Sequence, residues 1–94
     1  MDIIYTNHLR LRLKLRNFPE HYPREIYLNG EQSFFDVIEQ KFIAIKKLKY
    51  NGKFRNIMIA YKQSKELVEI FTIHPITDAK ILNRTLSGRW IKNE

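Results

Sequence analysis

The residues with the clearest chemical potential lie between Lys41 and Pro75. Eight Lys or Arg and no Asp or Glu fall between Lys41 and Lys65, so this stretch carries charge of one sign. Such a surface attracts anions, and nucleic acid is the main candidate. The stretch is followed by His74, whose side chain titrates near neutral pH and can take or give a proton. The pattern indicates anion binding with a proton-transfer group at one end.

Other kinds of site have little support in the sequence. The three histidines, His8, His21 and His74, lack the spacing of metal ligands, and no pair of carboxylates stands out. The chain has no Cys, so thiolate sites and disulfides are excluded. Glycine-rich phosphate loops and nucleophile elbows are missing as well. We therefore expect no metal site and no cofactor.

Size and composition indicate one compact domain over residues 1–94. Hydrophobic residues make up 44% of the chain, which suits a single modest core. The formal charge of +7 favours nucleic acid, an acidic protein or an anionic membrane surface as partner. We place the membrane last and expect no membrane association, because the charge falls on predicted strands and not along an amphipathic helix. No apolar run approaches the roughly 20 residues of a membrane helix either. A cytoplasmic protein is expected.

The elements that must position these residues are ambiguous in the first half of the chain. Residues 3–5 form a short β-rich run, and a Thr-Asn pair follows that can cap a helix. Over residues 8–16 Leu alternates with Arg or Lys as in a strand, yet every residue after the histidine is a good helix former. Pro23 fits the first turn of a second helix, which either continues toward Phe34 or breaks at Gly30.

The second half is clearer. Residues 42–50 and 53–62 flank Asn51-Gly52, the strongest short signal for a β-hairpin. Residues 63–66 make a second turn, and residues 67–74 form a third strand of an antiparallel meander. The last predicted helix begins at Asp78 and is followed by a tail at Arg89-Trp90; its signals are a Thr77 cap, one face with Ile81, Leu82 and Leu86, and a stop at Gly88.

Counting along the meander predicts which side chains are neighbours. A two-residue turn pairs Tyr50 with Lys53, and a four-residue second turn then places Arg55 opposite His74 on one face of the sheet. Changing the second turn by one residue would send Arg55 and His74 to opposite faces, so the pairing depends on that loop.

The order of these segments resembles the RelE/ParE-like toxin superfamily, and most of all a small uncharacterised branch with an N-terminal His and Arg pattern. The likeness covers nearly the whole chain, although each motif is short. It rests on the order of His8-x-x-x-Arg12, Gly52-Lys-x-Arg55, Thr72-Ile-His-Pro75, and Asn83-Arg84 followed by Arg89-Trp90. The resemblance implies that residues 8–16 are helical, in agreement with their helix propensity and the cap.

The resemblance implies a compact α+β domain of RelE-like fold. In it a short N-terminal strand and two helices pack on the three-stranded meander, a short C-terminal helix follows, and a groove for RNA lies on the other side. It also implies a metal-independent endoribonuclease of a toxin–antitoxin pair, in which the 2′-OH of RNA attacks the adjacent phosphate. The partners would be RNA and a small acidic antitoxin protein. His74 would be the acid or base and Arg55 would hold the phosphate; the expected RNA-binding residues are Lys46, Lys47, Lys49, Lys53, Tyr61 and Arg89.

Simpler interpretations stand beside these roles. A histidine before a proline is commonly a surface or capping residue, Arg55 could pair with a carboxylate such as Glu69, and Tyr61 could pack in the core. The alternative function is a non-catalytic module that binds nucleic acid or an acidic protein on the same scaffold. A poison of a DNA enzyme, as in the ParE branch, is a further hypothesis that the residues do not separate from binding in general.

Overall fold

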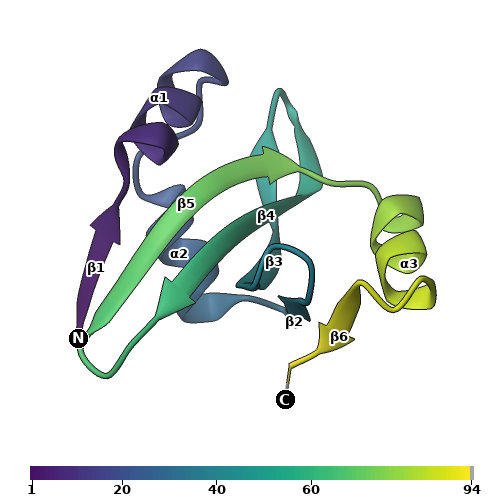
Figure 1. Cartoon of the computed structure of the whole chain (residues 1–94). Coiled ribbons are helices and arrows are strands. Elements are labelled where there is room, and N and C mark those ends of the chain that lie inside the picture. Colours follow the sequence, from purple (N-terminus) through teal and green to yellow (C-terminus); the bar gives the residue numbers. More distant parts are fainter. Residues whose placement is uncertain (94) are drawn as a thin grey trace.

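The chain folds into a compact α+β domain with three helices and a six-stranded mixed sheet in the computed structural model, which describes residues 1–93. In chain order the elements are β1 (Asp2–Tyr5), α1 (Asn7–Leu15), α2 (Tyr22–Asn29), β2 (Gln32–Asp36), β3 (Lys41–Tyr50), β4 (Lys53–Gln63), β5 (Leu67–Pro75), α3 (Asp78–Leu86) and β6 (Trp90–Lys92) (Figure 1).

The sheet has the strand order β1-β5-β4-β3-β2-β6. β1 runs parallel to β5, and all other neighbours are antiparallel. The predicted meander β3-β4-β5 is confirmed as the centre of this sheet (Figure 1). The hairpin register is confirmed as well, because Tyr50 pairs with Lys53 across a turn in which Asn51 and Gly52 both have positive φ.

Helix α1 resolves the conflict between alternation and propensity in favour of the helix. The Thr6 side chain accepts a hydrogen bond of 3.1 Å from the Leu9 backbone N–H and caps the first turn. Leu9 and Leu13, four residues apart, are buried, whereas the intervening Leu11 is exposed. Only one leucine in two therefore faces the core, as the period of a helix requires.

Two strands were not predicted from the sequence, one after helix α2 and one at the C-terminal end of the described residues. Helix α2 has Pro23 in its first turn as predicted and ends at Asn29, in agreement with the alternative of a break at Gly30. The residues that follow were not predicted as a strand, but they form β2 beside β3. The predicted tail at Trp90 is strand β6, which pairs with β2. Strand β6 pairs with a strand that is distant in the sequence. Strand β2 forms a hairpin with β3 across residues 37–40, a loop without Gly, Pro or Asn, so the local pattern gave no turn signal for it.

The two faces of the sheet bury separate cores. Helices α1 and α2 cover one face, where their apolar side chains pack on residues of β3, β4 and β5 such as Ala44, Ile59 and Ile73. Helix α3 lies on the opposite face, where Ile81 belongs to a cluster with Met58, Phe34 and Trp90. The helices are therefore not all on one side, contrary to the expectation from the resemblance.

Helix α3 is confirmed in its bounds but not in its predicted apolar face. Thr77 caps it through a hydrogen bond of 3.2 Å from the Lys80 backbone N–H. Ile81 is buried, whereas 57% of Leu82 and 78% of Leu86 are exposed. A single residue of the predicted stripe thus reaches the core.

The second turn has the predicted length of four residues but lies one residue further along the chain, and this displacement changes the register of β5. Gln63 pairs with Val68, and Met58, not Arg55, lies opposite His74. A β-bulge beside Ala60 shifts the pairing by one further residue. The predicted Arg55–His74 pair is therefore wrong.

Among the described residues, no helix is long and apolar enough to cross a membrane.

Candidate functional site

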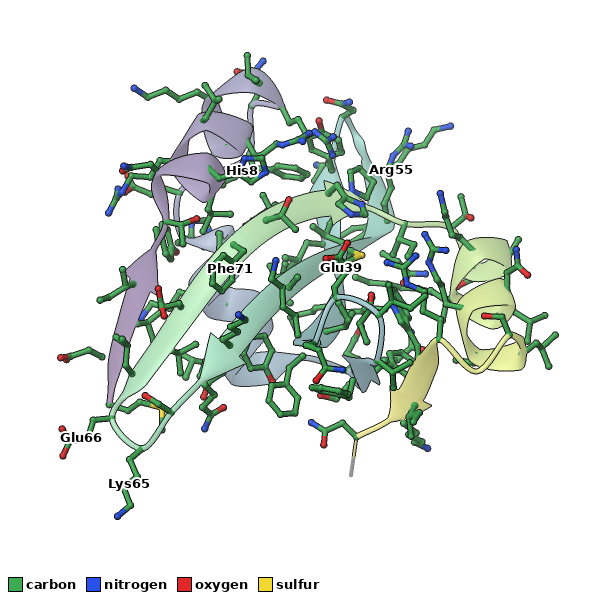
Figure 2. All side chains as sticks on the ribbon, viewed as in Figure 1. His8, Glu39, Arg55, Lys65, Glu66 and Phe71 are labelled. Carbon is green, nitrogen blue, oxygen red and sulfur yellow. The ribbon has the colours of Figure 1, made fainter. Side chains whose placement is uncertain are left out.

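A groove of about 500 Å³ lies on the face of the sheet that α1 and α2 leave open. Its floor comes from β3, β4 and β5, and its walls come from the start of α1, the loop between β2 and β3, and α3. Figure 2 looks onto this face, with Phe71 on β5, His8 above it on α1 and Glu39 on the opposite wall. The lining residues that carry charge or titrate are His8, Asp36, Glu39, Lys41, His74, Lys80, Arg84 and Arg89.

His74 is the central titratable group of this groove. Its Nδ1 lies 3.0 Å from the carbonyl oxygen of Pro75. A carbonyl can only accept, so Nδ1 carries the proton in this bond and Nε2 is left as the nitrogen that can receive a proton. Burial lowers the pKa of His74 below 6.5, and the positive charges of Arg16, Lys80 and Arg12 lower it further, against the opposing effect of the Pro75 bond. The imidazole is therefore neutral at pH 7.

Positive charge enters the groove from α3 and β3. Lys80 and Arg84 are four residues apart on α3, so both side chains lie on one helix face, and both line the groove. Lys41, at the start of β3, has its ammonium 4.6 Å from the centre of the Phe71 ring. Lys62 approaches the same ring to 5.8 Å. An aromatic ring with two flanking cations is suited to a nucleotide, whose base stacks and whose phosphate is anionic.

His8 reaches the groove from the first turn of α1. Its Nε2 accepts a hydrogen bond of 3.3 Å from Nε of Arg12. His8 is therefore a second histidine on the same groove, held by the next turn of its own helix.

Asp36 binds the C-terminal residues Arg89 and Trp90, which line one end of the groove. Its carboxylate is 3% exposed and accepts hydrogen bonds from the backbone N–H groups of Ile38 and Glu39, from Arg89 and from the Trp90 indole. Burial alone would raise the pKa of Asp36, but these hydrogen bonds outweigh it and hold the pKa below 3.8. The Arg89 guanidinium, 3.1 Å from the carboxylate, is thereby fixed in the groove wall.

The structure brings together only two of the residues that were predicted as a site from sequence, His74 and Arg89. Lys46 points to the helix-covered face, where its ammonium lies 4.0 Å from the Glu25 carboxylate. Tyr61 is 7% exposed and packs against the rings of Tyr27 and Phe42. Burial and the neighbouring Tyr27 raise the pKa of Tyr61, so its hydroxyl stays neutral.

The other four predicted residues lie at the end of the β3-β4 hairpin, away from His74. Arg55 is at this end, as Figure 2 shows, and it lines a separate hollow together with Lys47. Lys49 and Lys53 are exposed on the same hairpin. The cations of the predicted basic stretch are thus spread over both faces and the tip, because successive side chains of a strand alternate.

Sequence reasoning missed four groove residues: His8, Lys41, Lys80 and Arg84. The spacing of Lys80 and Arg84 on a predicted helix could have revealed a basic helix face. The sequence gave His8 a place in the His8-x-x-x-Arg12 motif but no role in the site, and only the packing of α1 beside β5 brings it to the groove. Within residues 1–93 no group of three His, Asp or Glu side chains is arranged to hold a metal ion.

Comparison of the chain with protein-family models, with curated proteins and with solved structures finds no match.

Proposed function

We propose that this protein is a toxin-like endoribonuclease that cuts RNA without a metal ion, through attack of a ribose 2′-OH on the adjacent phosphate. The observation that carries the proposal is His74, a neutral histidine with one free ring nitrogen in a groove of cations. Four cations line the groove against two carboxylates, and one of those carboxylates, Asp36, is already bonded to Arg89. The groove therefore favours an anionic ligand.

The proposed reaction uses these groups in sequence. Nε2 of His74 takes the proton of the 2′-OH, and the 2′-oxygen forms a bond to phosphorus. Negative charge grows on the phosphate oxygens, where Lys80 and Arg84 supply fixed positive charge. The bond from phosphorus to the 5′-oxygen then breaks, and the leaving oxygen receives a proton. The products are a 2′,3′-cyclic phosphate and a free 5′-OH.

His8 is the proposed source of that second proton, since it is the other histidine on the groove. To act as the acid it must first take a proton from solvent on Nε2, which releases the hydrogen bond from Arg12. In this scheme Arg55, expected from sequence to hold the phosphate, has no contact with the reacting group, and the role passes to Lys80 and Arg84. Its place at the hairpin tip keeps Arg55 available for a more distant part of the RNA.

The test is cleavage of a single-stranded RNA in the presence of a chelator, with His74→Gln, His8→Gln and His21→Gln compared. His21 lies at the start of α2 and does not line the groove, so it is the matched control. We expect His74→Gln to lose about 100- to 10,000-fold in rate, the usual contribution of one acid or base, and His21→Gln to behave like the parent. Intact RNA at high protein concentration, or equal activity of the His74 and His21 variants, would contradict the proposal. A 2′,3′-cyclic phosphate end identifies the chemistry.

The second candidate is a non-catalytic binding module for nucleic acid or for an acidic protein. It is favoured by the pairing of groove groups among themselves, because Arg12 already bonds His8 and Asp36 already bonds Arg89. This candidate predicts binding that weakens steeply between about 50 and 200 mM salt, with no cleavage by the parent protein. In either case a small acidic protein encoded beside this chain is the proposed partner that neutralises the basic groove.

A further inference from the structure

The tip of the β3-β4 hairpin carries an exposed aromatic side chain among cations. Phe54 is 75% exposed although phenylalanine is normally buried. Its chain neighbours are Lys53 and Arg55, and its partner across the hairpin is Lys49. Lys47, two residues from Lys49, lies on the same face as Phe54. Lys53 and Arg55 alternate to the other face, although Arg55 still lines the hollow beside Phe54.

Phe54 also lies on the same face of the sheet as the groove. Side chains of β4 alternate, so Phe54 shares its face with Asn56 and with Met58, the residue opposite His74. Four residues at about 3.3 Å each place Phe54 roughly 13 Å from Met58 along the strand. A hollow of about 320 Å³ lies beside Phe54, between the hairpin tip and the start of α3; it is lined by Lys47, Phe54, Arg55, Asn56, Pro75, Ile76, Thr77 and Asp78.

The two carboxylates near this patch are already engaged. Asp78 accepts a hydrogen bond of 2.7 Å from the Asn56 side chain. Glu31 accepts one of 2.9 Å from the Lys47 backbone N–H. Both donors are neutral, so the two carboxylates keep their negative charge, but the four cations of the hairpin tip outnumber them.

We propose that Phe54 is a stacking platform for a base of single-stranded nucleic acid, with Lys47 and Lys49 on the same face and Arg55 at the adjoining hollow binding the phosphates beside it. A base offers a flat face to the ring and brings negative charge next to it, and both match this surface. An apolar protein surface or a lipid bilayer fits less well, because Phe54 is the one large apolar side chain exposed on the described part of β3 and β4. The proposal rests on the proposed function in one respect only: the nucleic-acid strand bound at the hairpin tip would continue into the groove at His74.

Binding of a single-stranded DNA oligonucleotide of about a dozen nucleotides tests the platform without cleavage, because DNA lacks the 2′-OH. Phe54→Ala should raise the Kd at least about fivefold, the smallest effect expected for one lost stack. Phe54→Trp should bind like the parent, and its added indole should change fluorescence on binding, measured against the background of Trp90. Leu86→Ala is the matched control, since Leu86 is equally exposed but lies on α3 away from the tip.

A hairpin duplex separates stacking from charge, because its bases are already paired. We expect Phe54→Ala to bind the duplex as the parent does and Lys49→Gln to weaken binding to both ligands. Unchanged binding of the single strand by Phe54→Ala would overturn the proposal, as would an equal loss for single strand and duplex, or a parent protein that binds neither.

Cleavage of a dinucleotide distinguishes this proposal from the proposed function. With its one phosphate at His74, a dinucleotide keeps both bases near the groove, so Phe54→Ala should leave its cleavage unchanged and should slow cleavage of longer RNA. If no RNA is cut, the proposed function fails, and DNA binding by the Phe54 variants still decides the platform.

Discussion

Replacing Asp36 with Asn should destabilise the fold by about 3 kcal/mol or more, because Asp36 is a buried carboxylate that several donors share. Oδ1 accepts hydrogen bonds of 3.0 Å from the backbone N–H groups of Ile38 and Glu39. Oδ2 accepts from the Trp90 indole at 3.1 Å and from Nε of Arg89 at 3.2 Å. Asn keeps one acceptor oxygen, and its NH₂ group would face the indole and the guanidinium, which are both donors.

The size of the loss follows from these contacts. A buried N–H left without an acceptor costs about 1–3 kcal/mol, and a hydrogen bond to a charged group contributes about 1.5–3 kcal/mol. Removing one partner of a buried ion pair costs about 3–5 kcal/mol, and the 25% exposure of the Arg89 side chain places the expected value near the lower end. Glu39→Gln is the matched control: its carboxylate is 60% exposed and 4.0 Å from Arg89, so its loss should cost about 0–1 kcal/mol.

Urea unfolding provides the assay, with far-ultraviolet circular dichroism and the fluorescence of Trp90, the one tryptophan of the chain. The difference between parent and Asp36→Asn should also depend on pH. The pKa of Asp36 is lower in the folded than in the unfolded chain, so the unfolded chain binds more protons in acid and the stabilisation is present above the ordinary value of 3.8. It is lost as the pH falls through the folded pKa. A cost below about 1 kcal/mol, equal to that of Glu39→Gln, or a difference that does not shrink in acid, would refute this account.

Two further predictions concern the groove and the core. RNA cleavage should persist below pH 6.5, since burial, Arg16, Lys80 and Arg12 lower the pKa of His74 and keep the base neutral there; an acid limb of kcat/KM at or above 6.5 would contradict this assignment. Tyr61→Ala should cost about 3–5 kcal/mol in urea unfolding because the ring is buried in the core, whereas Tyr61→Phe should leave oligonucleotide binding unchanged. Weaker binding by Tyr61→Phe would return this hydroxyl to the RNA interface.

The elements that were predicted correctly are those determined by residues close together in the sequence. The hairpin follows from Asn51-Gly52, whose positive φ values suit a two-residue turn. Helix α1 follows from helix propensity and the Thr6 cap. Strand β6 has no such cause, since it forms only by pairing with β2, which is distant in the sequence, and its prediction needs the tertiary fold. Strand β2 forms a hairpin with β3, but the loop 37–40 lacks the turn residues that mark Asn51-Gly52.

The candidate site was less predictable because a charge count ignores which face a side chain takes. Lys46 and Lys47 are adjacent in the sequence, yet one lies against Glu25 under α2 and the other lies by the hollow at the hairpin tip. The groove cations Lys80 and Arg84 come from a segment with no conspicuous excess of charge. The position of a histidine predicted the site better than the charge count did. His74 is one of only three histidines in the chain, so its presence is informative whichever face its side chain takes.

The bulge in β5 decides which face of the sheet the His74 side chain takes. Ile70 pairs with Tyr61 and Thr72 pairs with Ala60, so Phe71 is the extra residue between them. Without the bulge Phe71 would pair with Ala60 and His74 with Ile57, so His74 would share a face with the core residues that α1 and α2 cover. The extra residue turns His74 onto the open face and places the Phe71 ring in the groove beside it. Bulges commonly re-aim side chains at functional sites. Here the bulge decides the face that His74 takes, and the bulge and the displaced second turn together account for the failed register prediction.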